Sequence, residues 1–120
     1  MVQGFAAIDM ETTGLSPRID RVVEIAVIQL DRDVLPCSEF ATLIKPGRDL
    51  GATHIHRITA SDVVSAPRFE QVAPMLLDLL RGRVIVAHNV QFDVRFLHAE
   101  FAWIGIELMA QAILQVKAGT

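Results

Sequence analysis

The 120-residue sequence has a single cysteine, no excess of positive charge and no long hydrophobic run. One thiol, Cys37, excludes an internal disulfide and a cysteine-rich zinc site, so a reducing cytoplasm is the expected location. The longest stretches without Asp, Glu, Lys or Arg are nine residues, at residues 84–92 and 108–116. That is about half of the ~20 residues that a membrane-spanning helix needs. We therefore expect neither a transmembrane segment nor a membrane partner.

The charge balance is mildly acidic, because 11 Lys and Arg face 14 Asp and Glu for a formal net charge of −3. A protein that coats DNA without regard to sequence needs a large cationic surface, which this composition excludes. An enzyme that holds only the end of a nucleic acid is not excluded. Since 52% of the residues are hydrophobic and no linker or repeat divides the chain, we expect one folded domain over residues 1–120.

The hydrophobic pattern predicts an α/β domain whose first three strands form an antiparallel meander. In order along the chain, the predicted elements are strands at residues 3–10, 21–30 and 35–44, a short helix from Thr59, a helix at 69–80, a strand at 84–87, and helices at 91–104 and 108–117. Thr59 and Asp62 have the spacing of a capping box. Pro74 is unfavourable inside its predicted helix, because it removes one backbone hydrogen bond.

Two carboxylates stand at the end of the first, otherwise apolar strand. Asp9 and Glu11 are two residues apart, so the strand repeat turns both to one side with their Cα atoms roughly 7 Å apart. Like charges held together need a cation, and carboxylate oxygens suit Mg²⁺ or Mn²⁺. Taken alone, the pair also fits an acidic strand end that leads into a loop.

A third carboxylate is predicted near the start of the helix at residues 91–104. Asp93 shares one helical stripe with Phe96, Leu97 and Glu100, so its side chain is expected to point inward, where a charge without a partner is costly. A metal shared with the two strand carboxylates would supply that partner. The alternative is an interaction of Asp93 with the amides and dipole of its own first turn.

Four segments in this order resemble the DEDD superfamily of 3′-to-5′ exonucleases. The segments are IDMETTGL at residues 8–15, VEIA at 23–26, HRIT at 56–59, and VAHN at 86–89 with Phe92, Asp93, Phe96 and Leu97. Over about residues 5–107 the sequence is similar to the His-type branch, which includes the proofreading epsilon subunit of bacterial DNA polymerase III. Arg57 stands where a Gly commonly follows the matching His.

The resemblance implies a ribonuclease H-like fold, with a mixed sheet of three antiparallel strands plus a parallel fourth and flanking helices. It implies that Asp9, Glu11 and Asp93 are catalytic and bind two divalent metal ions, Mg²⁺ or Mn²⁺. The substrate contacts that it implies are Met10, Thr12, Thr13, Gly14, Leu15, His88, Asn89 and Phe92. The implied substrate is the 3′ end of single-stranded DNA, in proofreading or repair, and the implied partner is a DNA polymerase subunit.

The family's third motif, a His followed five residues later by an Asp, has no separate match. His88 and Asp93 have this spacing but already belong to the second motif. We therefore expect a domain that is truncated at its C-terminus, with impaired activity and an uncovered apolar face that favours self-association. Two alternatives stay open: an RNA-trimming exoribonuclease of the same superfamily, and a catalytically inactive module that binds nucleic acid or a polymerase.

Overall fold

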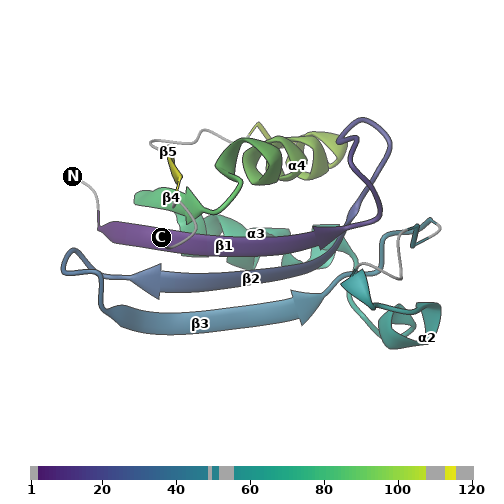
Figure 1. Cartoon of the computed structure of the whole chain (residues 1–120), viewed down its shortest axis with the longest axis horizontal. Helices are drawn as coiled ribbons and strands as arrows, with labels where there is room; N and C mark the ends of the chain where they lie inside the picture. Colours follow the sequence, from purple (N-terminus) through teal and green to yellow (C-terminus); the bar gives the residue numbers. More distant parts are fainter. Residues whose placement is uncertain (1–2, 49, 52–55, 108–112, 116–120) are drawn as a thin grey trace.

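A five-stranded sheet with strand order β3-β2-β1-β4-β5 forms the centre of the computed structural model (Figure 1). The structure describes residues 3–48, 50–51, 56–107 and 113–115. The strands are β1 Gly4–Thr12, β2 Val22–Leu30, β3 Pro36–Leu43, β4 Arg83–Ala87 and β5 Ile113–Gln115, and the helices are α2 Ala60–Val63, α3 Phe69–Leu80 and α4 Val90–Trp103. None of the described helices has both the length and the apolar character needed to cross a lipid bilayer.

The pairing of the strands confirms the predicted mixed sheet. β1 and β3 each run antiparallel to β2, while β4 runs parallel to β1. Alternating and buried apolar residues therefore identified these four strands correctly.

The helix predicted over residues 108–117 is wrong where the structure describes that segment. Residues 113–115 form β5, which pairs in parallel with β4, and the rest of the predicted helix lies outside the described residues. Periodicity cannot separate a short apolar strand from a helix, and the free edge of β4 offers backbone hydrogen bonds to a strand.

α3 and α4 pack against the sheet and close the main core. Figure 1 shows α3 behind the strands. The helix α4 follows β4 in the chain and lies on the β4 side of β1, away from β2 and β3. Phe69 of α3 meets Phe101 of α4 in an edge-to-face contact, with ring centroids 5.0 Å apart. Ile8 and Met10 of β1 are buried in this core, so the residues between them face the other side of the strand.

The face of the sheet opposite α3 carries half-buried apolar side chains. Phe5 and Val84 are neighbours there, as are Ala7 and Ile28. No helix among the described residues covers this face (Figure 1). Self-association through it stays a prediction. Light scattering at rising protein concentration checks it, and a monomer throughout would contradict it.

α3 continues through Pro74, which the sequence analysis identified as unfavourable. The helix begins after Arg68, whose backbone amide donates to the side-chain oxygen of Gln71 at 2.9 Å. Ala73 and Leu76 on either side of the exposed proline are buried, so packing of the apolar face offsets the missing backbone hydrogen bond.

We expect Pro74→Ala to raise the free energy of unfolding by about 1–2 kcal/mol. Alanine restores an amide donor inside the helix, and the more flexible unfolded chain removes part of that gain. Urea unfolding measures the change. The matched control is Met75→Ala at the next position, which is 51% exposed and should change stability by less than about 0.5 kcal/mol. A P74A variant no more stable than the parent chain would contradict the prediction.

Candidate active site

The central strand β1 places two carboxylates on the side opposite the core. Asp9 is exposed and Glu11 is half-buried, whereas the alternate residues Ile8 and Met10 are buried. Burial raises the pKa of the Glu11 carboxyl, and the neighbouring charge of Asp9 raises it further. The two carboxylates predicted from the strand repeat therefore interact electrostatically.

Two residues that the sequence analysis did not assign to the site lie next to Glu11. Glu24 pairs with it in the β1–β2 register and raises its pKa, while His56 lowers it. The Nδ1 atom of His56 accepts from the Ile58 amide at 3.0 Å, so Nε2 carries the proton and faces the Leu50 carbonyl at 2.9 Å. The strand pairing was a signal for Glu24, because a meander brings these positions together. Nothing local distinguished the role of His56.

Asp93 stands on the fourth residue of α4 and points inward, as predicted. It is 7% exposed, and no donor within the described part of the chain gives its carboxylate a hydrogen bond. Burial raises its pKa to about 6, and the charges of Asp9 and Glu11 act in the same direction, while His88 lowers it. The alternative, in which first-turn amides of α4 bind Asp93, is therefore not found.

The three carboxylates have the donor chemistry of a divalent-cation site. As they stand, no three His, Cys, Asp or Glu side chains in residues 3–48, 50–51, 56–107 and 113–115 form a group that could enclose an ion. Asp9, Glu11 and Asp93 nevertheless act on one another as like charges, and the carboxylate of the largely buried Asp93 has no hydrogen-bond donor among the described residues. Hard oxygen ligands fit Mg²⁺ or Mn²⁺, and a bound cation would draw the side chains together.

The loop between β1 and β2 holds several of the predicted substrate contacts. The Thr12 hydroxyl donates to the Gly14 carbonyl at 2.6 Å, and the Thr13 hydroxyl donates to Asp20 at 2.9 Å. Thr13 is 4% exposed, so its side chain serves the loop rather than a ligand. Leu15, by contrast, is 84% exposed at the tip.

The remaining predicted contacts divide in the same way. Met10 is buried in the main core, so its side chain faces away from the carboxylates. His88 and Asn89 are exposed in the turn between β4 and α4. The half-buried Phe92 packs against Phe96, with ring centroids 4.8 Å apart. The β1–β2 loop directly follows the strand that carries Asp9 and Glu11, and the β4–α4 turn directly precedes the helix that carries Asp93. Both the loop and the turn have exposed side chains.

Arg57 differs from its neighbours in backbone conformation. Its φ is 62°, in the left-handed region that glycine adopts without strain and most other residues avoid. This conformation suits the glycine that commonly stands at this position in the resemblance, and here an arginine adopts it.

Comparisons with known proteins agree with this geometry. A family model described as Exonuclease matches residues 6–117. The DNA polymerase III subunit epsilon of Treponema pallidum is 40% identical over 100 residues, which cover 82% of this chain and 46% of that protein. The DNA polymerase III PolC-type of Thermotoga petrophila is 39% identical over 95 residues, or 78% of this chain and 7% of that protein. The chain therefore spans less than half the length of these curated relatives.

A solved structure shares the fold. Exonuclease I superposes with a TM-score of 0.80 at 21% sequence identity, over 94% of this chain and 28% of that one. The likeness identifies the architecture as ribonuclease H-like, with β5 added to the predicted four strands.

The buried Asp93 carboxylate should oppose folding of the metal-free chain at neutral pH. Its pKa is about 6 when folded and near 4 when unfolded, so the folded chain binds more protons between these values. Stability therefore falls as the pH rises from about 4 to about 6 and stays low above that. We expect Asp93→Asn to raise the free energy of unfolding by at most about 3 kcal/mol at pH 7.5, and by much less at pH 4.

Urea unfolding in EDTA at the two pH values measures this difference. The matched control is Asp78→Asn, because Asp78 is 73% exposed and should change stability little at either pH. A D93N variant with the same stability gain at pH 4 and pH 7.5, or with none, would contradict the prediction.

Proposed function

The chain belongs to the exonuclease family, and from that premise we propose that it is a metal-dependent 3′-to-5′ exonuclease domain that hydrolyses the terminal phosphodiester of DNA. The observation that carries the proposal is Asp93, a largely buried residue whose carboxylate has no hydrogen-bond donor among the described residues, reaches solvent and faces the charges of Asp9 and Glu11. Exonucleases of this family are generally dependent on divalent metal. Three acids whose charges act on one another, offset only in part by His56 and His88, support such a site in this chain.

In this proposal Asp9, Glu11 and Asp93 are the catalytic residues and hold two divalent ions, Mg²⁺ or Mn²⁺. Bound there, such ions would supply the acidification of a water and the stabilisation of negative charge that hydrolysis of a phosphodiester requires. The contribution of the chain is to keep three deprotonated carboxylates on rigid elements, two on the central strand and one on α4. The pKa values of Glu11 and Asp93 are raised, so protons compete with a cation for these two carboxylates in acid and much less at neutral pH.

The proposed substrate surface consists of the β1–β2 loop and the β4–α4 turn. Leu15 offers an exposed apolar side chain to the last base, and Thr12 and Gly14 lie beside it. We assign the exposed His88 and Asn89 to contacts with the sugar and phosphate, and the half-buried Phe92, which follows them on α4, to the same surface. Met10 and Thr13, whose side chains are buried, would act through their backbone and through the shape of the loop.

The relatives favour DNA over RNA as the substrate class. Two of them carry the names DNA polymerase III subunit epsilon and DNA polymerase III PolC-type. On the same ground we propose that the whole protein associates with a DNA polymerase subunit. None of the described residues favours the RNA-trimming alternative. A protein distinguishes RNA from DNA by contacts to the 2′-hydroxyl, and those contacts are defined by a bound substrate.

We expect slow Mn²⁺-dependent digestion of a 5′-labelled single-stranded DNA oligonucleotide into a ladder that shortens from its 3′ end, because the family's third motif has no separate match in this sequence. RNA of the same sequence should be digested more slowly. Asp9→Ala should lower the rate at least about 100-fold, since it removes a proposed metal ligand. The matched control is Asp33→Ala, an exposed acid in the β2–β3 turn, which should leave the rate unchanged.

Three results would change the proposal. Equal digestion by the parent chain and D9A would contradict the metal assignment. Faster digestion of RNA would favour the exoribonuclease. Mn²⁺-dependent binding of DNA without digestion would favour the inactive binding module.

A further inference from the structure

Two buried acids take no part in the proposed site. Asp20 is 9% exposed and Glu100 is 1% exposed, and both have hydrogen-bond donors, unlike Asp93. Both hold the loop at residues 13–21, which joins β1 to β2 and carries the exposed Leu15. The identity of the ligand assigned to this loop, single-stranded DNA, rests on the proposed function.

The Asp20 carboxylate ties the beginning of the loop to its end. Its Oδ1 atom accepts from the Thr13 hydroxyl at 2.9 Å, and its Oδ2 atom accepts from the Ser16 amide at 3.0 Å. Arg48 lies 3.3 Å from Oδ1, which partly balances the charge. The Asp20 amide in turn donates to the Ser16 carbonyl at 2.7 Å. One side chain therefore links three separate points of the loop.

Gly14 shows how tightly the loop closes on this carboxylate. A Cβ atom at position 14 would lie 2.4 Å from Oδ2 of Asp20, which is closer than any such contact allows. The loop also meets a second backbone, because a Cβ at Gly51 would lie 2.0 Å from the Thr13 carbonyl oxygen. Glycine is required at both positions by close approach.

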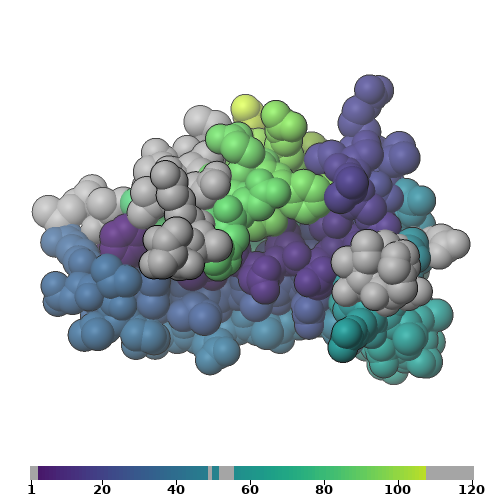
Figure 2. Space-filling view, in the orientation of Figure 1, coloured from purple at the N-terminus to yellow at the C-terminus, as the bar shows by residue number. Residues whose placement is uncertain are grey.

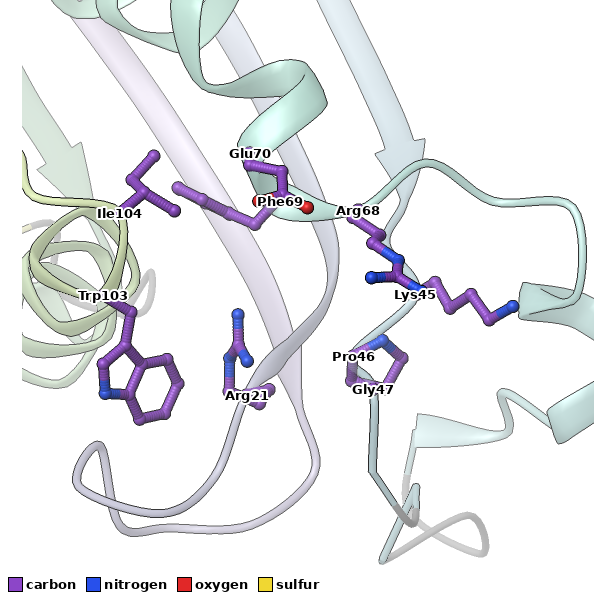
Figure 3. A pocket seen from close by; sticks show the side chains of 9 residues that line it. All are labelled: Arg21, Lys45, Pro46, Gly47, Arg68, Phe69, Glu70, Trp103 and Ile104. Carbon is purple, nitrogen blue, oxygen red and sulfur yellow. The ribbon is translucent and has the colours of Figure 1, made fainter.

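Glu100 fixes the far end of the loop to the helix that carries Asp93. Its carboxylate accepts from Nε and Nη2 of Arg21 at 3.0 and 2.7 Å, and from the Val22 amide at 2.8 Å. Figure 3 shows the Arg21 side chain beside Trp103, whose ring centre is 4.1 Å from the guanidinium carbon. Glu100 follows Asp93 by seven residues, two helical turns, so both acids lie on one face of α4.

The result is a braced loop with an apolar tip. Leu15 is 84% exposed and Ile19 is 64% exposed, although contact of an apolar side chain with water is unfavourable. In the space-filling view the loop, coloured blue-purple, projects beyond the body of the molecule next to α4 (Figure 2). Because its conformation is set before any ligand arrives, binding to this tip costs little conformational entropy.

We propose that Asp20 is a positioning residue, which holds the loop at residues 13–21 so that Leu15 and Ile19 meet the 3′-terminal nucleotide of single-stranded DNA. Asp20 itself touches neither the three site carboxylates nor the ligand. Removing it frees the loop, and the apolar tip then loses the fixed surface on which a terminal base stacks. Stacking of one base on an aromatic ring is worth about tenfold or more in affinity, and we expect the aliphatic Leu15 and Ile19 together to reach the lower end of that range.

The test measures recognition of a 3′ end by fluorescence anisotropy in EDTA, where metal-dependent hydrolysis cannot occur. Two labelled oligonucleotides of one sequence are compared, one with an ordinary 3′ terminus and one closed by a 3′–3′-linked nucleotide, which leaves two 5′ ends. We expect the parent chain to prefer the ordinary terminus by about tenfold. Asp20→Ala should remove that preference while affinity for the closed oligonucleotide stays the same.

Two further variants separate positioning from general damage. Asp20→Asn keeps an oxygen for the Thr13 hydroxyl and should restore part of the preference. Gly14→Ala should lower the preference by itself, because its Cβ meets Asp20, yet should add nothing in the G14A/D20A double variant. Asp33→Ala is the matched control, and melting curves verify that each variant is folded.

A parent chain without preference for the ordinary terminus would overturn the proposal, as would a D20A variant that keeps the preference. Additive effects of G14A and D20A would also overturn it, since the two residues would then act independently. These readouts do not depend on catalysis. Failure of the D9A digestion test with loss of end preference in D20A would reject the exonuclease proposal and leave the positioning role intact.

Discussion

The mutual repulsion of Asp9, Glu11 and Asp93 is the constraint on which the arrangement of the site depends. Carboxylates held close to one another raise each other's pKa and oppose folding unless other interactions keep them in place. β1 does so for two of them, because it is hydrogen-bonded on both sides, to β2 and to β4. α4 does so for Asp93, because Phe96 and Leu97 on its inner face are fully buried. Hydrophobic packing therefore offsets a cost that the site itself creates.

α4 carries two buried acids whose environments differ, and the difference separates scaffold from site. Glu100 is met by a guanidinium and a backbone amide, so its charge is compensated within the fold. Asp93, on the same face of the helix, has no donor among the described residues and instead faces further negative charge. A buried acid whose partners are complete serves structure. A carboxylate that has no donor in the protein depends on water or a bound cation to balance its charge. The surroundings of Asp93 therefore support a cation site more strongly than its burial does.

Much of this arrangement could be predicted from the sequence, because it follows from short-range geometry. The strand repeat put Asp9 and Glu11 on one side, and the helical repeat put Asp93 inward with Phe96 and Leu97; the structure has both. The same repeat also placed Glu100 inward, which signalled a partner without naming it. Arg21 lies 79 residues away in the sequence, and no local pattern connects the two.

Other features depended on tertiary contacts that a pattern does not contain. Thr13 and Leu15 belong to one predicted segment, yet only packing around Asp20 decides that the first is buried and the second exposed. β5 was predicted as part of a helix, because a short apolar run suits either structure and the edge of β4 selects the strand. The φ of 62° at Arg57 likewise follows from the path of the chain around it rather than from its side chain.

The mild acidity of the chain is consistent with a protein that holds an end rather than a length of nucleic acid. Affinity for a long strand comes largely from cations that neutralise phosphates, and two arginines that contact the β1–β2 loop are already engaged, Arg21 with Glu100 and Arg48 with Asp20. The acids of the proposed site weaken the hold on a phosphate there before cations bind, so the apolar tip would supply the attraction to a terminal base in that state. In the proposed function, a rigid apolar tip next to such a site would attract a terminal base without adding positive charge, so selectivity for an end and dependence on metal would follow from one distribution of charge.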